Sequence, residues 1–177
     1  MHESCGVFGV YAPGEDVARL TFFALFALQH RGQESAGIAT TDGKSLRVYA
    51  QMGLVSQAFS EESLSLLDGH IAIGHNRYST TGSSRISNAQ PIKVSRGPHT
   101  IAIAHNGNIV NADNLYKELS DQGYSFQTTT DTEVIGNLIL SSHEKGWVDR
   151  IRYAMRRLRG AYSTVMIADN TLFAIRD

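Results

Sequence analysis

The sequence predicts one layered domain of mixed helices and strands, of the α/β or α+β class. Three short apolar runs are typical of strands that are buried on both faces, at residues 5–10, 71–74 and 101–104. The segment from Asp16 to about His30 is predicted to be a helix that is apolar on almost every face, so we expect other layers to cover it on two sides. Stacked layers, with sheets inside and helices outside, are consistent with these patterns.

The remaining elements are predicted from local signals. Asp42-Gly43 and Asp169-Asn170 have the composition of tight hairpin turns, Gly123 is placed to end a helix, and Thr130 to Glu133 fits a capping box. In chain order we expect strands at 36–41 and 46–51, a helix within 61–67, helices at 112–122, 130–142 and 148–158, and strands at 161–168 and 171–175. Residues 83–98 read as a long loop, and loops of that length in a compact domain are usually functional.

Length, composition and charge describe an ordinary globular domain. The chain has 177 residues, of which 42% are hydrophobic and 19% charged, and its net charge is −1. This charge predicts no nucleic-acid partner. The longest apolar run, residues 22–28, is far shorter than the ~18 residues that cross a membrane, so we expect no membrane association. The N-terminus lacks the pattern of a secretory signal, which predicts a cytoplasmic protein.

Cys5 is the only cysteine in the sequence. It cannot form an intramolecular disulfide or a multi-thiolate metal site, which leaves packing or reactivity. A buried packing role is one interpretation. The other is that removal of residues 1–4 places a thiol and a free α-amino group on one residue, which makes a nucleophile with its own base.

Dense polar motifs follow three predicted elements. Arg77 at a strand end offers a planar fork of donors that suits a carboxylate. Asn106-Gly107 offers a side-chain amide and an unhindered N–H, the two donors that an oxyanion needs. Asp131 at a helix start could bind an ammonium group. Together they describe a nucleophile, an oxyanion hole and a clamp for an α-amino acid.

Each of these residues has a structural alternative. Asp131 would also complement a helix dipole, Asn106-Gly107 would also form a turn, and Arg77 would also form an ion pair. His75 and His105 could bind metal or act as a base for Cys5, although strand-end histidines are more often hydrogen-bonded structure. The spacing of the histidines supports no metal site.

The quoted stretches together resemble the glutaminase domain of class II glutamine amidotransferases, which are N-terminal-nucleophile hydrolases. The resemblance runs from Cys5 to Asp177. Within the class it favours the phosphoribosylpyrophosphate amidotransferase branch, through the motifs at residues 29–38, 74–82 and 158–162. The glucosamine-6-phosphate synthase branch, the alternative, usually has Tyr-Arg-Gly-Tyr-Asp-Ser and Arg-Trp-Ala-Thr at the first two of these places.

The resemblance implies an α+β fold, a four-layer αββα sandwich, and L-glutamine as the ammonia donor. It implies Cys5 as the nucleophile with its own α-amino group as the base, and an oxyanion hole made by the side chain of Asn106 and the N–H of Gly107. The implied substrate-binding residues are Arg77 for the α-carboxylate, Asp131 for the α-amino group, Arg31 in the glutamine loop and Thr80 in the pocket wall.

The same resemblance implies a domain organisation. Residues 1–4 would be a propeptide and residues 5–177 the glutaminase domain, with a phosphoribosyltransferase domain of the same polypeptide absent from this chain. That second domain would use the ammonia and phosphoribosyl pyrophosphate to make 5-phosphoribosylamine, the first step of de novo purine synthesis. We expect no cofactor or metal in the glutaminase domain, Mg²⁺ in the phosphoribosyltransferase domain, and a homo-oligomer at full length. The resemblance leaves an iron–sulfur cluster open.

Two functional alternatives remain at this point. The four residues before Cys5 could keep the chain as a non-catalytic glutamine-binding module. A conventional Cys–His pair would make a cysteine hydrolase that needs no processing.

Overall fold

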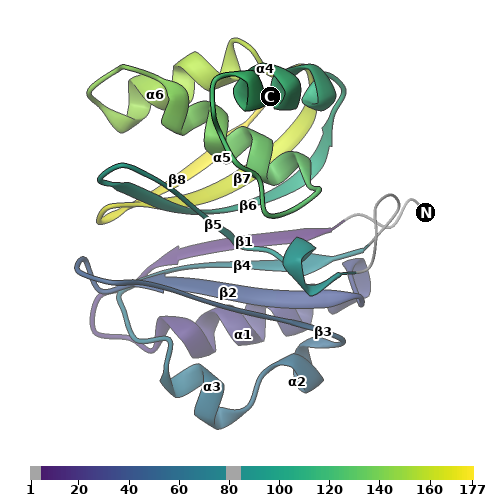
Figure 1. The fold of residues 1–177 in the computed structure, drawn as a ribbon. Coiled ribbons are helices and arrows are strands. Elements are labelled where there is room, and N and C mark those ends of the chain that lie inside the picture. The colour runs from purple at the N-terminus through teal and green to yellow at the C-terminus, as the bar shows by residue number, and fades with distance from the viewer. Residues whose placement is uncertain (1–4, 79–84) are drawn as a thin grey trace.

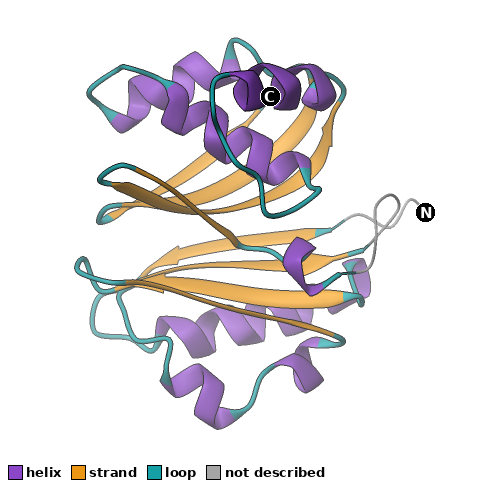
Figure 2. Ribbon diagram, in the orientation of Figure 1, coloured by secondary structure: helices purple, strands orange, loops and turns teal. Residues whose placement is uncertain are grey.

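Two four-stranded antiparallel sheets lie face to face, and helices cover the outer side of each (Figures 1 and 2). The structure is a computed structural model and describes residues 5–78 and 85–177. The first sheet has the strand order β1-β4-β2-β3 and the second the order β5-β6-β7-β8. The predicted α+β class and four-layer αββα sandwich are therefore confirmed.

The elements alternate irregularly along the chain. The strands are β1 (Gly6–Tyr11), β2 (Ser35–Thr41), β3 (Leu46–Met52), β4 (Ile71–Arg77), β5 (Ile92–Arg96), β6 (His99–Ile109), β7 (Gly160–Ala168) and β8 (Thr171–Arg176). The helices are α1 (Val17–Ala27), α2 (Val55–Ala58), α3 (Glu61–Ser65), α4 (Ala112–Asp121), α5 (Asp131–Ser141) and α6 (Trp147–Met155), with 3-10 turns η1 (Gln29–Arg31) and η2 (Ile86–Asn88). Helices α1–α3 cover the first sheet and α4–α6 the second (Figure 1). None of these helices is long and apolar enough to cross a membrane.

The layer between the two sheets is packed with small and branched side chains. Ala39, Ile73, Ala102, Ala104 and Ile167 are fully buried there. Separate apolar clusters lie between each sheet and its helices. Small side chains let two sheets approach closely, so the middle layer holds their relative position and with it the strand ends at the edge of the sandwich.

The predicted turns are confirmed. Gly43 and Asp169 have φ of 85° and 50° in the two hairpins, and Gly123 has φ of 83° after α4. Glycine, asparagine and aspartate tolerate this left-handed region best, so residue type alone places such turns.

The prediction that the first helix is covered on two sides is wrong. Helix α1 buries Val17, Thr21 and Leu25 against the first sheet. On the opposite face Phe23 is 65% and Phe26 53% exposed. The helix lies in an outermost layer, where a sheet covers one side only. Its apolar residues on every face therefore did not indicate that the helix is covered on two sides.

Two further predictions are corrected by the structure. Residues 83–98 are not one loop, because β5 forms within them and pairs with β6. The capping box also does not form, since the hydroxyl of Thr130 makes no cap bond to α5. The carboxylate of Glu133 instead accepts hydrogen bonds from the N–H groups of Gln127 and Thr128. The same carboxylate therefore ties down the loop that leads into Asp131.

His75 is a fully buried histidine on β4. Its Nε2 lies 3.2 Å from the carbonyl oxygen of His105, which only accepts, so Nε2 carries the proton. Burial, followed by the charges of His105 and Arg77, lowers the pKa of His75 to about 3. The ring is therefore neutral in the folded protein at neutral pH.

This burial makes the stability of the fold pH-dependent. Below about pH 6.5 the unfolded chain protonates His75 while the folded chain does not, so the free energy of unfolding falls as the pH drops toward 3. We expect His75→Gln to reduce the slope of the free energy of unfolding against pH by about 1.4 kcal/mol per pH unit between pH 6 and pH 4. Denaturant titrations at several pH values measure it, with His143→Gln, at an exposed histidine, as the control. Equal slopes in all three proteins would contradict the prediction.

Candidate active site

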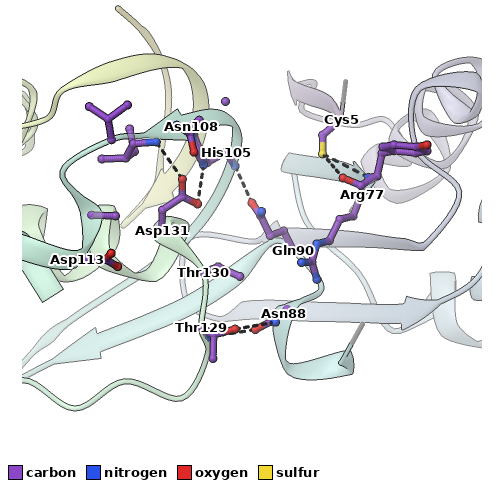
Figure 3. Close-up of a pocket in the computed structure, with 15 residues that line it drawn as sticks. Cys5, Arg77, Asn88, Gln90, His105, Asn108, Asp113, Thr129, Thr130 and Asp131 are labelled. Carbon is purple, nitrogen blue, oxygen red and sulfur yellow. Dashed lines mark hydrogen bonds and ion pairs between the residues drawn. The ribbon is translucent and has the colours of Figure 1, made fainter. Parts of the chain in front are cut away.

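A pocket of about 790 Å³ opens at the end of the sandwich where β1 begins and β4 and β6 end. Its wall is built from Cys5, the end of β4, the segment before β5, the end of β6 and the start of α5 (Figure 3). Strand pairing explains this convergence. Gly6 pairs with Asn76 in the first sheet, which places Cys5 beside the end of β4.

The thiol of Cys5 contacts the backbone of Tyr78. Its Sγ accepts a hydrogen bond from the N–H of Tyr78 at 3.3 Å and lies 3.5 Å from the carbonyl oxygen of the same residue. The ring of His75 reaches the carbonyl of His105, and the ring of His105 reaches Asp131. Neither histidine is bonded to the thiol, so the geometry gives no support to a Cys–His pair.

The backbone carbonyl of Cys5 is held by two of the predicted site residues. Asn106 Nδ2 donates to this oxygen at 2.5 Å, and Arg31 Nε donates to it at 3.4 Å. An amide nitrogen carries two hydrogens, so Asn106 keeps a second donor. Arg31 thus lies beside the nucleophile, in η1, and is absent from the described wall of the pocket.

Gly107 lines the pocket next to Asn106. Its φ is 142°, and a Cβ at this position would lie 2.2 Å from the carbonyl oxygen of Ala161 on β7. Only glycine therefore fits here, which explains the Asn-Gly pair seen in the sequence.

Arg77 and Asp131 lie on opposite sides of the pocket (Figure 3). The side chain of Arg77 is 8% exposed, and its Nη1 lies 3.8 Å from Oε1 of Glu34. That separation is an ion pair without a hydrogen bond, and Nη1 has no hydrogen-bond partner among the described residues. The charge of Glu34 thus holds Arg77, which still has donors available for a ligand. Arg77 therefore fits both interpretations from the sequence, a structural ion pair and a group that binds a carboxylate.

Asp131 is the first residue of α5. Its Oδ2 accepts from the N–H of Ile109 at 3.2 Å, and its Oδ1 lies 3.4 Å from Nδ1 of His105. Burial raises the pKa of the Asp131 carboxyl, but the interactions with His105 and with the N–H of Ile109 outweigh it and hold the pKa below its usual value. The group is an anion at neutral pH, as recognition of an ammonium requires.

The structure adds three polar residues that sequence reasoning did not single out. They are Glu34 behind Arg77, Asn88, and Gln90 in the pocket wall. Asn88 exchanges two hydrogen bonds with Thr129 and so ties η2 to the loop before Asp131. The length of the predicted loop 83–98 was the available signal for the last two. Thr80, predicted for the pocket wall, lies outside the described residues.

Comparison with known proteins identifies the family. Residues 75–177 match the family model described as a glutamine amidotransferase domain. The chain belongs to the glutamine amidotransferase family. Among the residues that the structure describes, no group of three or more His, Cys, Asp or Glu side chains could hold a metal ion in this amidotransferase domain.

Curated relatives narrow the comparison. An amidophosphoribosyltransferase of Synechococcus elongatus is 49% identical over 177 residues, and one of Methanocaldococcus jannaschii is 46% identical over 178 residues. These alignments include 99% and 98% of this chain but 36% and 37% of the relatives. The amidotransferase domain therefore spans about a third of the length of these relatives.

Solved structures agree with the fold. The glutamine phosphoribosylpyrophosphate amidotransferase from B. subtilis, complexed with ADP and GMP, matches 97% of this chain and 37% of its own, with a TM-score of 0.88 and 39% identity. A predicted glutamine amidotransferase from Pseudomonas aeruginosa matches at a TM-score of 0.51 and 18% identity, which shows the fold alone.

Proposed function

We propose that this domain hydrolyses L-glutamine to glutamate and ammonia. The observation that carries the proposal is the convergence of a thiol, a guanidinium and a carboxylate on one pocket, from Cys5, Arg77 and Asp131. A cation and an anion on opposite sides match the two charged ends of an α-amino acid. Cys5 and the glycine of the proposed oxyanion hole line the same pocket, where the side-chain carboxamide would react.

The bond changes follow from these positions. With residues 1–4 removed, the α-amino group of Cys5 takes the proton of the thiol, and Sγ forms a bond to the carboxamide carbon. The oxygen of the tetrahedral intermediate accepts from Asn106 Nδ2 and the N–H of Gly107. The C–N bond then breaks, the α-ammonium returns the proton to the leaving nitrogen, and ammonia departs. Water hydrolyses the thioester to glutamate and restores the thiol.

We further propose that the ammonia serves a phosphoribosyltransferase domain of the same polypeptide, which makes 5-phosphoribosylamine from phosphoribosyl pyrophosphate in purine synthesis. Support comes from the relatives, which are named amidophosphoribosyltransferases and of which this chain matches about a third. Glutaminase domains of other class II amidotransferases are the alternative. A cytoplasmic location stays a prediction, since a relative from Arabidopsis thaliana is named as chloroplastic.

The active form is expected to begin at Cys5. The α-amine of Cys5 can act as a base only when it is not part of a peptide bond to Ser4. Intact mass spectrometry of protein that hydrolyses glutamine should show loss of residues 1–4. Protein that retains them should be inactive. Full glutaminase activity in a preparation that keeps Met1 would refute this mechanism.

A further inference from the structure

Gln90 is a buried side chain in the pocket wall that the hydrolysis described above does not use. It lies in the segment before β5, and 6% of its surface is exposed. Buried side-chain amides usually form hydrogen bonds through both the oxygen and the nitrogen, so each of these two atoms of Gln90 requires a partner.

The strand register fixes the oxygen end of the amide. Ile92 pairs with Ile103, and continuing that register brings Gln90 opposite His105, just beyond the end of β5. There Oε1 of Gln90 accepts the backbone N–H of His105 at 2.7 Å. Because a backbone N–H only donates, the oxygen of the amide must face His105 and the nitrogen must face away.

The backbone of Gln90 is fixed as well. A Cβ at Gly37 on β2 would lie 2.2 Å from the carbonyl oxygen of Gln90, so the segment is in close contact with the first sheet. The side chain is therefore held at its base by β2 and at its oxygen by β6.

The nitrogen end is a donor without a partner in the described part of the chain. Nε2 makes no hydrogen bond to any described residue, and the side chain runs between the guanidinium of Arg77 and the His105–Asp131 pair (Figure 3). An ammonium group has no lone pair to accept from Nε2, whereas a carboxylate has several. A ligand that places its carboxylate on Arg77 also brings an acceptor toward Nε2.

We propose that Gln90 Nε2 donates to the α-carboxylate of the bound amino acid and, with Arg77, makes ligands with a free α-carboxylate bind more tightly than ligands without one. This inference rests on the proposed function, since it assumes an α-amino acid in the pocket. It adds a specificity-determining residue to the site.

Gln90→Glu tests the proposal because it changes one end of the side chain. The variant keeps an oxygen for the N–H of His105, removes the donor, and sets a negative charge against the substrate carboxylate. Two unreactive ligands provide the readout, L-glutamate and L-isoglutamine, which differ only in having an α-carboxylate or an α-carboxamide. We expect the Kd of L-glutamate to rise at least about tenfold and that of L-isoglutamine to change by less than about twofold.

Calorimetric titration of protein that begins at Cys5 measures both constants. Gln51→Glu, the same change at an exposed site on β3, is the matched control and should leave both Kd values unchanged. Arg77→Ala should shift the ratio of the two constants in the same direction as Gln90→Glu. Thermal unfolding of each variant identifies any that does not fold, and Gln90→Met, which removes both polar ends, then replaces Gln90→Glu.

The outcomes separate this inference from the proposed function. If Gln90→Glu, or Gln90→Met in its place, weakens both ligands by the same factor, Gln90 only supports β6 and the inference is wrong. If wild-type protein binds L-glutamate with the expected discrimination but does not hydrolyse L-glutamine, the proposed function fails and the assignment of Gln90 stands. If wild-type protein binds neither ligand, both are overturned.

Discussion

Replacing Cys5 with alanine is expected to abolish hydrolysis of L-glutamine. The thioester needs the sulfur of Cys5, and the sequence contains no second cysteine that could take its place. The thiol is half-buried with two backbone contacts, so its loss should leave the fold intact. Release of glutamate from Cys5→Ala protein should fall to the background rate measured without protein.

Chemical labelling provides the control for this prediction. A glutamine-analogue electrophile should attach to one site of the wild-type protein, and L-glutamine should protect that site. The alanine variant should remain unlabelled while its thermal unfolding midpoint stays near that of the wild type. Labelling that persists in the alanine variant would move the nucleophile to another residue.

Asn106→Ala is expected to lower kcat for L-glutamine by about a hundred- to a thousandfold with little change in KM. One donor to the developing oxyanion is lost, which typically costs about 3 kcal/mol of barrier, whereas the groups that bind the two charged ends of the substrate stay in place. Steady-state measurement of glutamate formation tests this split between kcat and KM. Asn114→Ala, on the exposed side of α4, makes the same chemical change and should have wild-type kinetics.

A fall in kcat of Asn106→Ala would have a second explanation, because Asn106 also contacts the carbonyl of Cys5. This explanation can be tested separately. Alkylation of Cys5 by iodoacetamide forms no oxyanion, so its rate reports only whether the thiol is correctly placed. We expect Asn106→Ala to be alkylated at nearly the wild-type rate. A parallel loss of alkylation and of kcat would mean that Asn106 acts by positioning Cys5.

The turn predictions were reliable because the physical cause of a turn is local. A hairpin turn depends on which residue tolerates a left-handed backbone, so Gly43 and Asp169 were predicted from residue type. Strand β5 was missed because its pairing with β6 is a contact between segments, and its sequence carries the polar signals of a loop. The exposed face of α1 was missed because hydrophobicity does not say on how many sides a helix is covered.

The features of the candidate site likewise separate into those that the local sequence determines and those that only the tertiary structure sets. The sequence by itself determined the lone thiol and the Asn106-Gly107 pair, and the family resemblance predicted the roles of Arg77 and Asp131. The tertiary structure alone decided which side chains contact the site residues. Glu34 pairs with Arg77, His105 pairs with Asp131, and Gln90 accepts a hydrogen bond from the N–H of His105. Such pairs depend on the register between strands and on the contact of two sheets, which local spacing does not encode.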